Sequence, residues 1–109
     1  MSMQKDIIVF FSTAPKDTSE SLARMLLEKH IVACVNVVPV RSYYRWKGEF
    51  CSEQEDLLIA KTTKEKAGEV IAALQGLHPY EVPEIIALQV IDGYLPYLEW
   101  VNKETLDEP

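Results

Sequence analysis

The feature that most constrains the fold of this 109-residue chain is a pair of long strand-forming segments joined by a short turn. Residues 33–46 are rich in β-branched and aromatic side chains, and residues 50–63 return as strand after Lys47-Gly48, with Pro39 expected at a bend or bulge. Arms of roughly 13 residues extend about 40 Å at ~3.3 Å per residue. A domain of this length has a radius of gyration of only about 13 Å, so its core cannot cover such a hairpin.

Four aromatic residues gather near the predicted hairpin tip: Tyr43, Tyr44, Trp46 and Phe50. A two-stranded tip is only marginally stable in water, and this one would expose a sizeable aromatic patch. A stacking platform for bases or sugars is an alternative use of such a patch. Because the chain is acidic, packing against another subunit is the favoured explanation.

The segments before the hairpin predict one strand and one helix. Residues 7–11 are a short β-branched and aromatic run, typical of a central strand buried on both faces. Asp17 is expected to cap a helix over residues 18–30, with Glu20 completing a variant capping box. The helix would present Leu22 and Leu26 on one stripe.

After the hairpin, Thr63 is expected to cap a second helix, which Gly76 and His78-Pro79 end. Residues 85–91 predict a further strand in the sheet interior or at a covered edge, and residues 94–101 a C-terminal helix before a polar, frayed tail from residue 102. The order predicts an α+β, ferredoxin-like βαββαβ fold with a long hairpin between its second and third strands and a C-terminal helix. Residues 1–109 are expected to form a single domain.

Charge and composition limit which partners the protein is expected to bind and in which cellular compartment it is expected to lie. The net charge of −6 and the absence of a Lys/Arg cluster argue against nucleic acid as a partner. No apolar run approaches the ~20 residues of a membrane span, and the N-terminus has no signal-peptide pattern. The two cysteines, Cys34 and Cys51, form no CxxC motif and suggest reduced thiols in the cytoplasm.

The segment His78-Pro79-Tyr80-Glu81-Val82-Pro83-Glu84 carries the candidate metal ligands. An imidazole and two carboxylates suit divalent metals such as Zn, Cu(II) or Mn, and the two prolines hold the segment extended. The alternative is a rigid turn in which His78 caps the second helix and the glutamates pair with lysines. Cys34 is a further candidate ligand, with a buried, apolar role as its alternative.

Motifs of enzyme chemistry are absent, so a catalytic role is not expected. The chain has no Gly-rich phosphate loop, no HExxH and no GxSxG. Ser12 follows a predicted strand, but no histidine lies near it in sequence. A hydrolase would require a base within hydrogen-bond reach of that hydroxyl.

An ordered set of motifs along the chain resembles the CutA family of divalent-cation tolerance proteins. The set comprises Ser12-Thr13-Ala14-Pro15, Ala33-Cys34-Val35-Asn36, Ser42-Tyr43-Tyr44-Arg45-Trp46-Lys47-Gly48, Lys61-Thr62-Thr63, the segment from His78 to Ile85, Gly93 and Tyr97-Leu98-x-Trp100. The resemblance implies a cytoplasmic homotrimer, similar in architecture to the PII signalling proteins, with a role in metal tolerance and copper as the proposed metal. Ser12 and Leu77 depart from the family, some members of which have cysteine and histidine there.

Two functions follow as hypotheses. The first is a trimeric module for divalent cations, copper above all, with His78, Glu81, Glu84 and Cys34 as candidate ligands. The second is a trimeric scaffold or signalling module whose inter-subunit clefts bind a small organic ligand or a partner protein. The residues expected at the interface between subunits are Tyr43, Tyr44, Trp46, Phe50, Tyr80 and Trp100.

Overall fold

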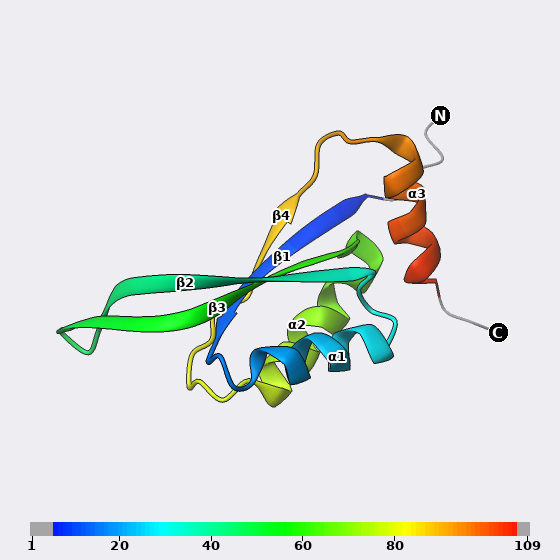
Figure 1. Cartoon of the computed structure of the whole chain (residues 1–109). Coiled ribbons are helices and arrows are strands. Elements are labelled where there is room, and N and C mark those ends of the chain that lie inside the picture. The colour runs from blue at the N-terminus through cyan, green and yellow to red at the C-terminus, as the bar shows by residue number, and fades with distance from the viewer. Residues whose placement is uncertain (1–5, 107–109) are drawn as a thin grey trace.

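A computed structural model describes residues 6–106 and shows a four-stranded sheet with two helices on one face and a third helix at one end (Figure 1). The elements run in the predicted order. They are β1 (Ile7–Ala14), α1 (Ser19–Glu28), β2 (Cys34–Trp46), β3 (Glu49–Thr63), a 3-10 turn (Lys64–Lys66), α2 (Ala67–Leu77), β4 (Ile86–Gln89) and α3 (Leu95–Glu104). No helix of the described residues is long and apolar enough to cross a membrane.

The sheet is antiparallel throughout and has the strand order β2-β3-β1-β4. This order confirms the ferredoxin-like prediction, and β1 lies at the centre as expected. Its residues alternate between buried and half-buried, so β1 is fully covered on one face only. The prediction of burial on both faces was wrong for that strand, because the third helix reaches only one end of the second face.

The main core lies between the sheet and the helices α1 and α2. Phe10 and Leu58 from the sheet meet Leu26 and Leu74 from the helices, and each is almost fully buried. A smaller cluster joins α3 to the start of β1, where Ile7 packs against α3. We call the sheet face turned away from α1 and α2 the open face, and α3 covers only its β1-start end.

The β2–β3 hairpin projects from this body, as its length required. The pairing runs without interruption from Cys34 opposite Lys61 to Trp46 opposite Glu49. Of the bend or bulge expected at Pro39, no bulge forms, because the pairing continues through Pro39 opposite Asp56. The strand β2 is an edge strand, and an edge position tolerates a missing N–H. Lys47 and Gly48 both have positive φ (51° and 82°), as in a tight type I′ turn. The radius of gyration is 14.9 Å and the longest dimension 50 Å, so the hairpin extends the molecule (Figure 1).

Several predicted boundaries were wrong at the ends of elements. The N-cap position of α1 is Thr18 rather than Asp17, and the Thr18 hydroxyl donates to the Pro15 carbonyl instead of capping the helix. The helix ends at Glu28, and His30 takes a left-handed conformation with φ of 59°. Thr63 precedes the 3-10 turn without a side-chain cap.

The last strand and the C-terminal segment also differ from expectation. The strand predicted over residues 85–91 is limited to Ile86–Gln89 and forms an exposed sheet edge. The tail predicted to be frayed from residue 102 is helical as far as Glu104, where α3 ends. Residues 107–109 of that tail lie outside the described residues.

A buried carboxylate on β3 ties the hairpin base to the start of α1. Asp56 is 8% exposed and accepts hydrogen bonds from Ser19 Oγ (2.6 Å) and Lys16 Nζ (3.3 Å). The Ser19 hydrogen bond, and then Lys16, lower the pKa of Asp56 from its ordinary value by stabilising the ionised form. This contact fixes the β1–α1 connection against the strand that also carries the hairpin.

Ser19→Ala removes the interaction that lowers the pKa of Asp56 most. A lowered folded-state pKa contributes stability above the unfolded pKa of about 4, and this contribution is lost as the pH falls through the folded-state value. We expect the variant to be less stable than the wild type at neutral pH, with a difference that shrinks toward about pH 3. Urea unfolding at both pH values measures it.

Ser21→Ala is the matched control, because the Ser21 hydroxyl is exposed and donates a hydrogen bond to the Thr18 carbonyl one turn back. It should change stability little at either pH. A pH-independent difference between Ser19→Ala and the wild type would contradict the assignment to Asp56.

Candidate functional site

A groove of about 670 Å³ lies between the hairpin and the segment that follows α2. We call it the hairpin groove. Its volume falls within the range of small-molecule sites, about 300–1,000 Å³. The residues that line it are Thr13, Ser42, Tyr43, Tyr44, Trp46, Glu53, Glu55, Pro79, Tyr80, Glu81, Val82 and Glu84.

Strand alternation places most of the hairpin side chains of this groove on one side. Ser42 lies opposite Glu53 in the ladder, so their side chains share the open face. Tyr44 and Trp46 follow Ser42 at intervals of two residues and therefore point the same way. The opposite wall comes from residues 79–84, which lead from α2 toward β4.

Two tyrosine hydroxyls donate to the glutamates of the groove. Tyr44 Oη lies 2.7 Å from Glu53 Oε1, and this hydrogen bond raises the pKa of Tyr44 to about 12. Tyr80 Oη lies 2.9 Å from Glu55 Oε1, and Glu55 is only 4% exposed. Burial, and then the Glu55 hydrogen bond, raise the pKa of Tyr80 as well. Both phenols therefore stay neutral at physiological pH and fix the position of one carboxylate each.

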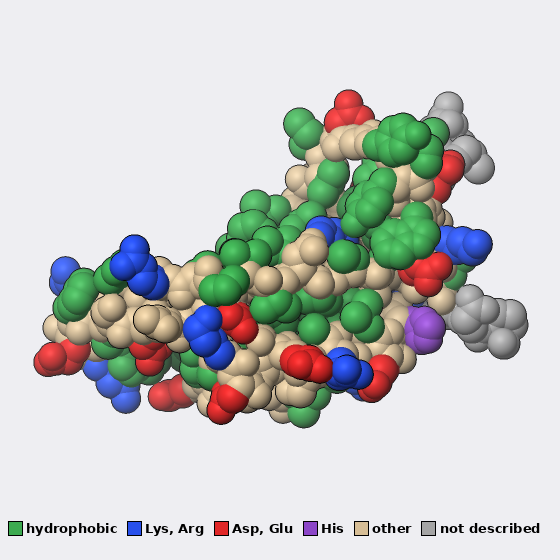
Figure 2. Space-filling view, in the orientation of Figure 1, with side chains coloured by type: hydrophobic (Ala, Val, Ile, Leu, Met, Phe, Trp, Pro, Cys, Tyr) green, Lys and Arg blue, Asp and Glu red, His purple; other side chains and the backbone are tan. Residues whose placement is uncertain are grey.

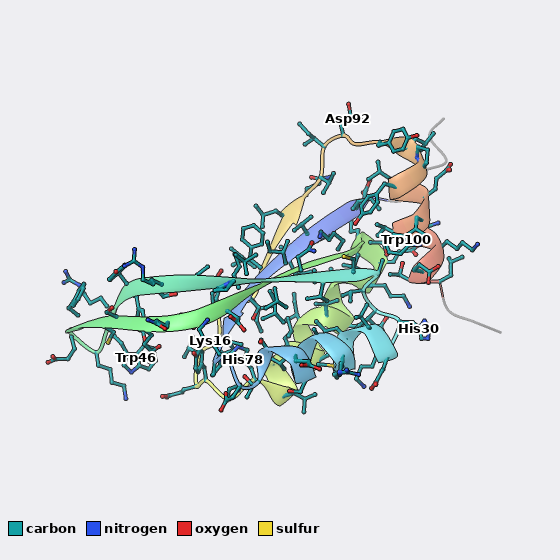
Figure 3. The ribbon with its side chains drawn as sticks, in the orientation of Figure 1. Lys16, His30, Trp46, His78, Asp92 and Trp100 are labelled. Carbon is teal, nitrogen blue, oxygen red and sulfur yellow. The ribbon has the colours of Figure 1, made fainter. Side chains whose placement is uncertain are left out.

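His78 is held at the base of the hairpin by both of its ring nitrogens (Figure 3). Nε2 lies 2.7 Å from the Thr13 carbonyl oxygen, and Nδ1 accepts a hydrogen bond from the Tyr80 N–H at 3.2 Å. Since Nδ1 accepts, the proton of the neutral ring lies on Nε2 and is donated to Thr13. Neither nitrogen has a free lone pair directed at a metal, so coordination requires the ring to exchange one of these partners.

The other predicted metal ligands are not gathered around His78 in one chain. Glu81 and Glu84 line the groove, whereas Cys34 begins β2 at the other end of the sheet. Within residues 6–106, no group of three or more His, Cys, Asp or Glu side chains is arranged to hold a metal ion. The ligand prediction is therefore not supported by the geometry of a single chain, and it stays a prediction for an assembly.

Cys34 lies in a separate environment beneath α3. Its Sγ is 3.8 Å from Lys61 Nζ, and Lys61 pairs with Val9 of β1. Thr13, which His78 contacts, is four residues further along β1, about 13 Å away at ~3.3 Å per residue. Burial, and then the neighbouring Cys34, raise the pKa of Tyr97 on α3. Cys34 and His78 could share an ion only if they came from different subunits.

The predicted interface aromatics do not form one patch. Tyr43 and Phe50 stack with ring centroids 6.3 Å apart, and the ladder places Phe50 on the face opposite to Tyr44 and Trp46. Figure 3 shows Trp46 out along the hairpin and Trp100 on α3, far from it. Trp100 packs against Tyr97 at 5.7 Å and remains 41% exposed. The hairpin therefore presents aromatic surface on both of its faces.

Sequence analysis overlooked Glu53 and Glu55 as groove residues. The available signal was their spacing of two residues on β3, which places both on the same face as Ser42. Ser12, the conditional nucleophile, is 2% exposed on the helix-covered face, and its hydroxyl has no hydrogen-bond partner among the described residues. Within residues 6–106, the base that the hydrolase alternative requires makes no hydrogen bond to this hydroxyl.

Comparison with known proteins places these features in context. A family model for the CutA1 divalent ion tolerance protein matches residues 7–104. A divalent-cation tolerance protein CutA from Thermus thermophilus is 38% identical over 99 residues, which are 90% of this chain and 96% of the relative. The match to the family includes both arms of the hairpin and the segment from residue 78 to 84.

Solved structures agree over almost the same extent. CutA1 from Oryza sativa has a TM-score of 0.92 at 36% identity and covers 98% of this chain and 100% of its own. A PII-like protein CutA from Nostoc sp. PCC 7120, in apo form, has a TM-score of 0.88 at 39% identity and covers 91% and 97%. The shared architecture includes the projecting hairpin, because coverage of both chains is nearly complete.

His78→Ala is expected to lower the free energy of unfolding by about 2–3 kcal/mol, from two lost hydrogen bonds and a lost buried ring. The neighbouring Leu77→Ala is the matched control, since Leu77 is 58% exposed and should cost about 0.5 kcal/mol or less. Urea unfolding at equal protein concentrations compares the two variants. Equal stability losses would mean that the His78 hydrogen bonds do not hold the segment in place.

Proposed function

Because this chain belongs to the CutA family of divalent-cation tolerance proteins, we propose that it works as a homotrimer that binds divalent cations. The observation that carries the proposal is the uncovered apolar surface of the open face. Support for association comes from that surface, and support for the number three comes from the family resemblance. A non-catalytic role in the cytoplasm is part of the same proposal and is supported by the sequence alone.

The open face is too apolar for a surface in permanent contact with water. Val38, Ile86 and Leu88 are 40%, 49% and 43% exposed, and Ile91 beyond β4 is 97% exposed. Figure 2 shows hydrophobic side chains gathered over β4, β1 and α3. A contiguous apolar surface of this kind marks an interaction site in a soluble protein.

The total accessible surface and the two sheet edges also support association between subunits. The accessible surface of 7323 Å² exceeds the roughly 6,100 Å² expected for a compact monomer of this mass. Both β2 and β4 are edge strands with unpaired backbone groups on their outer sides. Neighbouring subunits would cover the open face and pair with these edges, which removes apolar surface and free backbone groups from water together.

Leu88→Glu is expected to weaken the trimer, because it places a charge on the apolar open face. Light scattering with size-exclusion chromatography should give three times the 12.4 kDa chain mass for the wild type and a smaller mass for the variant at micromolar concentration. Ile71→Glu is the matched control, since Ile71 is equally exposed (43%) but lies on α2. It should leave the mass unchanged.

A folded wild type with the mass of one chain would contradict the trimer. Equal effects of Leu88→Glu and Ile71→Glu would contradict the choice of the open face as the interface.

Metal binding through His78 needs the imidazole to exchange a hydrogen-bond partner for the ion. Glu81 and Glu84, which line the groove, would have to move toward the ring or come from another subunit to complete the site. Cys34 would join from another subunit. Copper is the proposed metal, because imidazole and thiolate both suit it.

Copper titration followed by calorimetry is expected to show weaker binding by His78→Ala than by the wild type. Glu28→Gln, which removes a carboxylate at the end of α1 outside the groove, should bind as the wild type does. Equal affinities of His78→Ala and the wild type would remove His78 from the ligand set.

A second candidate function is favoured by the hairpin groove itself. Its 670 Å³ volume and aromatic walls suit a small organic ligand better than a bare ion. In this case the trimer is a binding or signalling module, and the segment from residue 78 to 84 forms one wall of its ligand site.

A further inference from the structure

We propose that the projecting hairpin docks an acidic, extended peptide segment of a partner protein on the side that faces away from the open face. This surface consists of Arg41, Tyr43, Arg45 and Phe50, and we call it the basic hairpin face. The subunits that would cover the open face leave it exposed, because it lies on the other side of the sheet. The inference goes beyond the proposed functions and rests on neither of them.

The strand register separates the charges of the hairpin by face. Arg41 and Arg45 stand opposite the neutral residues Gln54 and Phe50 in the ladder. Odd positions of β2 and even positions of β3 share this side, whereas the glutamates of the hairpin occupy odd positions of β3 and point to the open side. Figure 2 shows basic and hydrophobic side chains along the upper side of the projecting hairpin and acidic ones along its lower side.

Both guanidinium groups lack an anionic partner within the described part of the chain. Arg41 and Arg45 are exposed, and neither forms an ion pair within residues 6–106. The next carboxylate on this side of the ladder, Asp56, is already bonded to Ser19 and Lys16. Two unpaired positive charges on a chain of net charge −6 favour an anionic partner at this face.

An aromatic stack lies between the two charges. Tyr43 is placed between Arg41 and Arg45 on β2 and stacks on Phe50, with 6.3 Å between the ring centroids. The two aromatic residues remain 59% and 77% exposed, so the rest of the chain does not cover the stack. A hollow of about 440 Å³ beside it is lined by Tyr43, Tyr44, Arg45, Gly48 and Phe50. Because aromatic residues and arginine are enriched at protein–protein interfaces, this combination favours a protein partner.

The order of charge, ring and charge along β2 fits the period of an extended peptide. Arg41 and Arg45 are four residues apart, a distance of about 13 Å at ~3.3 Å per residue. Carboxylates at positions i and i+4 of an extended partner are separated by the same distance, and the side chain at i+2 then meets Tyr43 and Phe50. In an α-helix the same spacing spans only about 6 Å. The partner is therefore an extended segment with a carboxylate on either side of an apolar residue.

Large polyanions fit this face less well than a short segment does. A nucleic acid or an anionic membrane would also approach the acidic remainder of the chain and the glutamates on the other side of the hairpin. Like charges that approach each other oppose binding. A short acidic segment avoids this cost, because it contacts the basic hairpin face alone.

The end-blocked peptide Ser-Glu-Ser-Phe-Ser-Glu-Ser tests the proposal, and Ser-Ser-Glu-Phe-Glu-Ser-Ser is a control of identical composition and charge. In an NMR titration of the isotope-labelled full chain, the first peptide is expected to shift amide signals of residues 41–52. It should bind about threefold tighter than the control or more. Equal affinities would overturn the extended geometry that defines the partner. No shift at millimolar peptide concentration would overturn the docking face itself.

Arg41→Gln and Arg45→Gln locate the site. Each should weaken binding of the first peptide about threefold to tenfold, because one of two charge pairs is lost. Both arginines are exposed, so neither substitution is expected to change stability. Arg24→Gln removes the same charge from the surface of α1 and should bind the peptide like the wild type. Equal weakening by all three variants would assign the binding to overall charge and overturn the site.

Two further measurements detect other occupants of the basic hairpin face. Vesicles that contain phosphatidylserine are expected not to co-sediment with the protein, and co-sedimentation that Arg45→Gln abolishes would assign the face to a membrane. Light scattering is expected to give the same mass for Arg45→Gln and the wild type, and a mass that this variant lowers would assign the face to a second copy of the chain. Either of these contrary results would overturn the peptide proposal.

Discussion

The pairing of β2 with β3 along their whole length is the constraint on which the rest of the structure depends. The ladder continues from Cys34 at the body of the sheet to Trp46 at the tip, well beyond the reach of α1 and α2. Its inner part supplies the core with Leu58, and its middle part carries Asp56, which anchors the start of α1. Its outer part contributes no residue to the core. The side chains of that part remain uncovered, and several of them line one wall of the groove.

The groove exists because the segment after α2 is tied back to that hairpin. His78 bonds to the carbonyl of Thr13 at the end of β1, and Tyr80 bonds to Glu55 on β3. These two contacts join residues 65 and 25 positions apart, so they fix the segment in space rather than shaping it locally. Pro79 and Pro83 restrict the same segment from within its sequence. Two long-range hydrogen bonds and two prolines therefore hold this wall in position.

The same hydrogen bonds change the chemical meaning of the histidine. In the sequence, an imidazole beside two carboxylates indicates a metal site. In the fold, both ring nitrogens are already used, and Glu81 and Glu84 face a groove with aromatic walls. The acidic groove attracts cations through its overall charge.

The sequence by itself determined the order of the elements, the long hairpin and the family, because periodicity, turn residues and ordered motifs are local properties. It also predicted that the hairpin would leave aromatic residues uncovered. Only the tertiary structure decided which face each aromatic takes, that Cys34 and His78 lie apart, and that Glu53 and Glu55 meet Tyr44 and Tyr80. The physical reason is register: a one-residue shift of a strand moves every side chain to the other face, and register is set by long-range pairing.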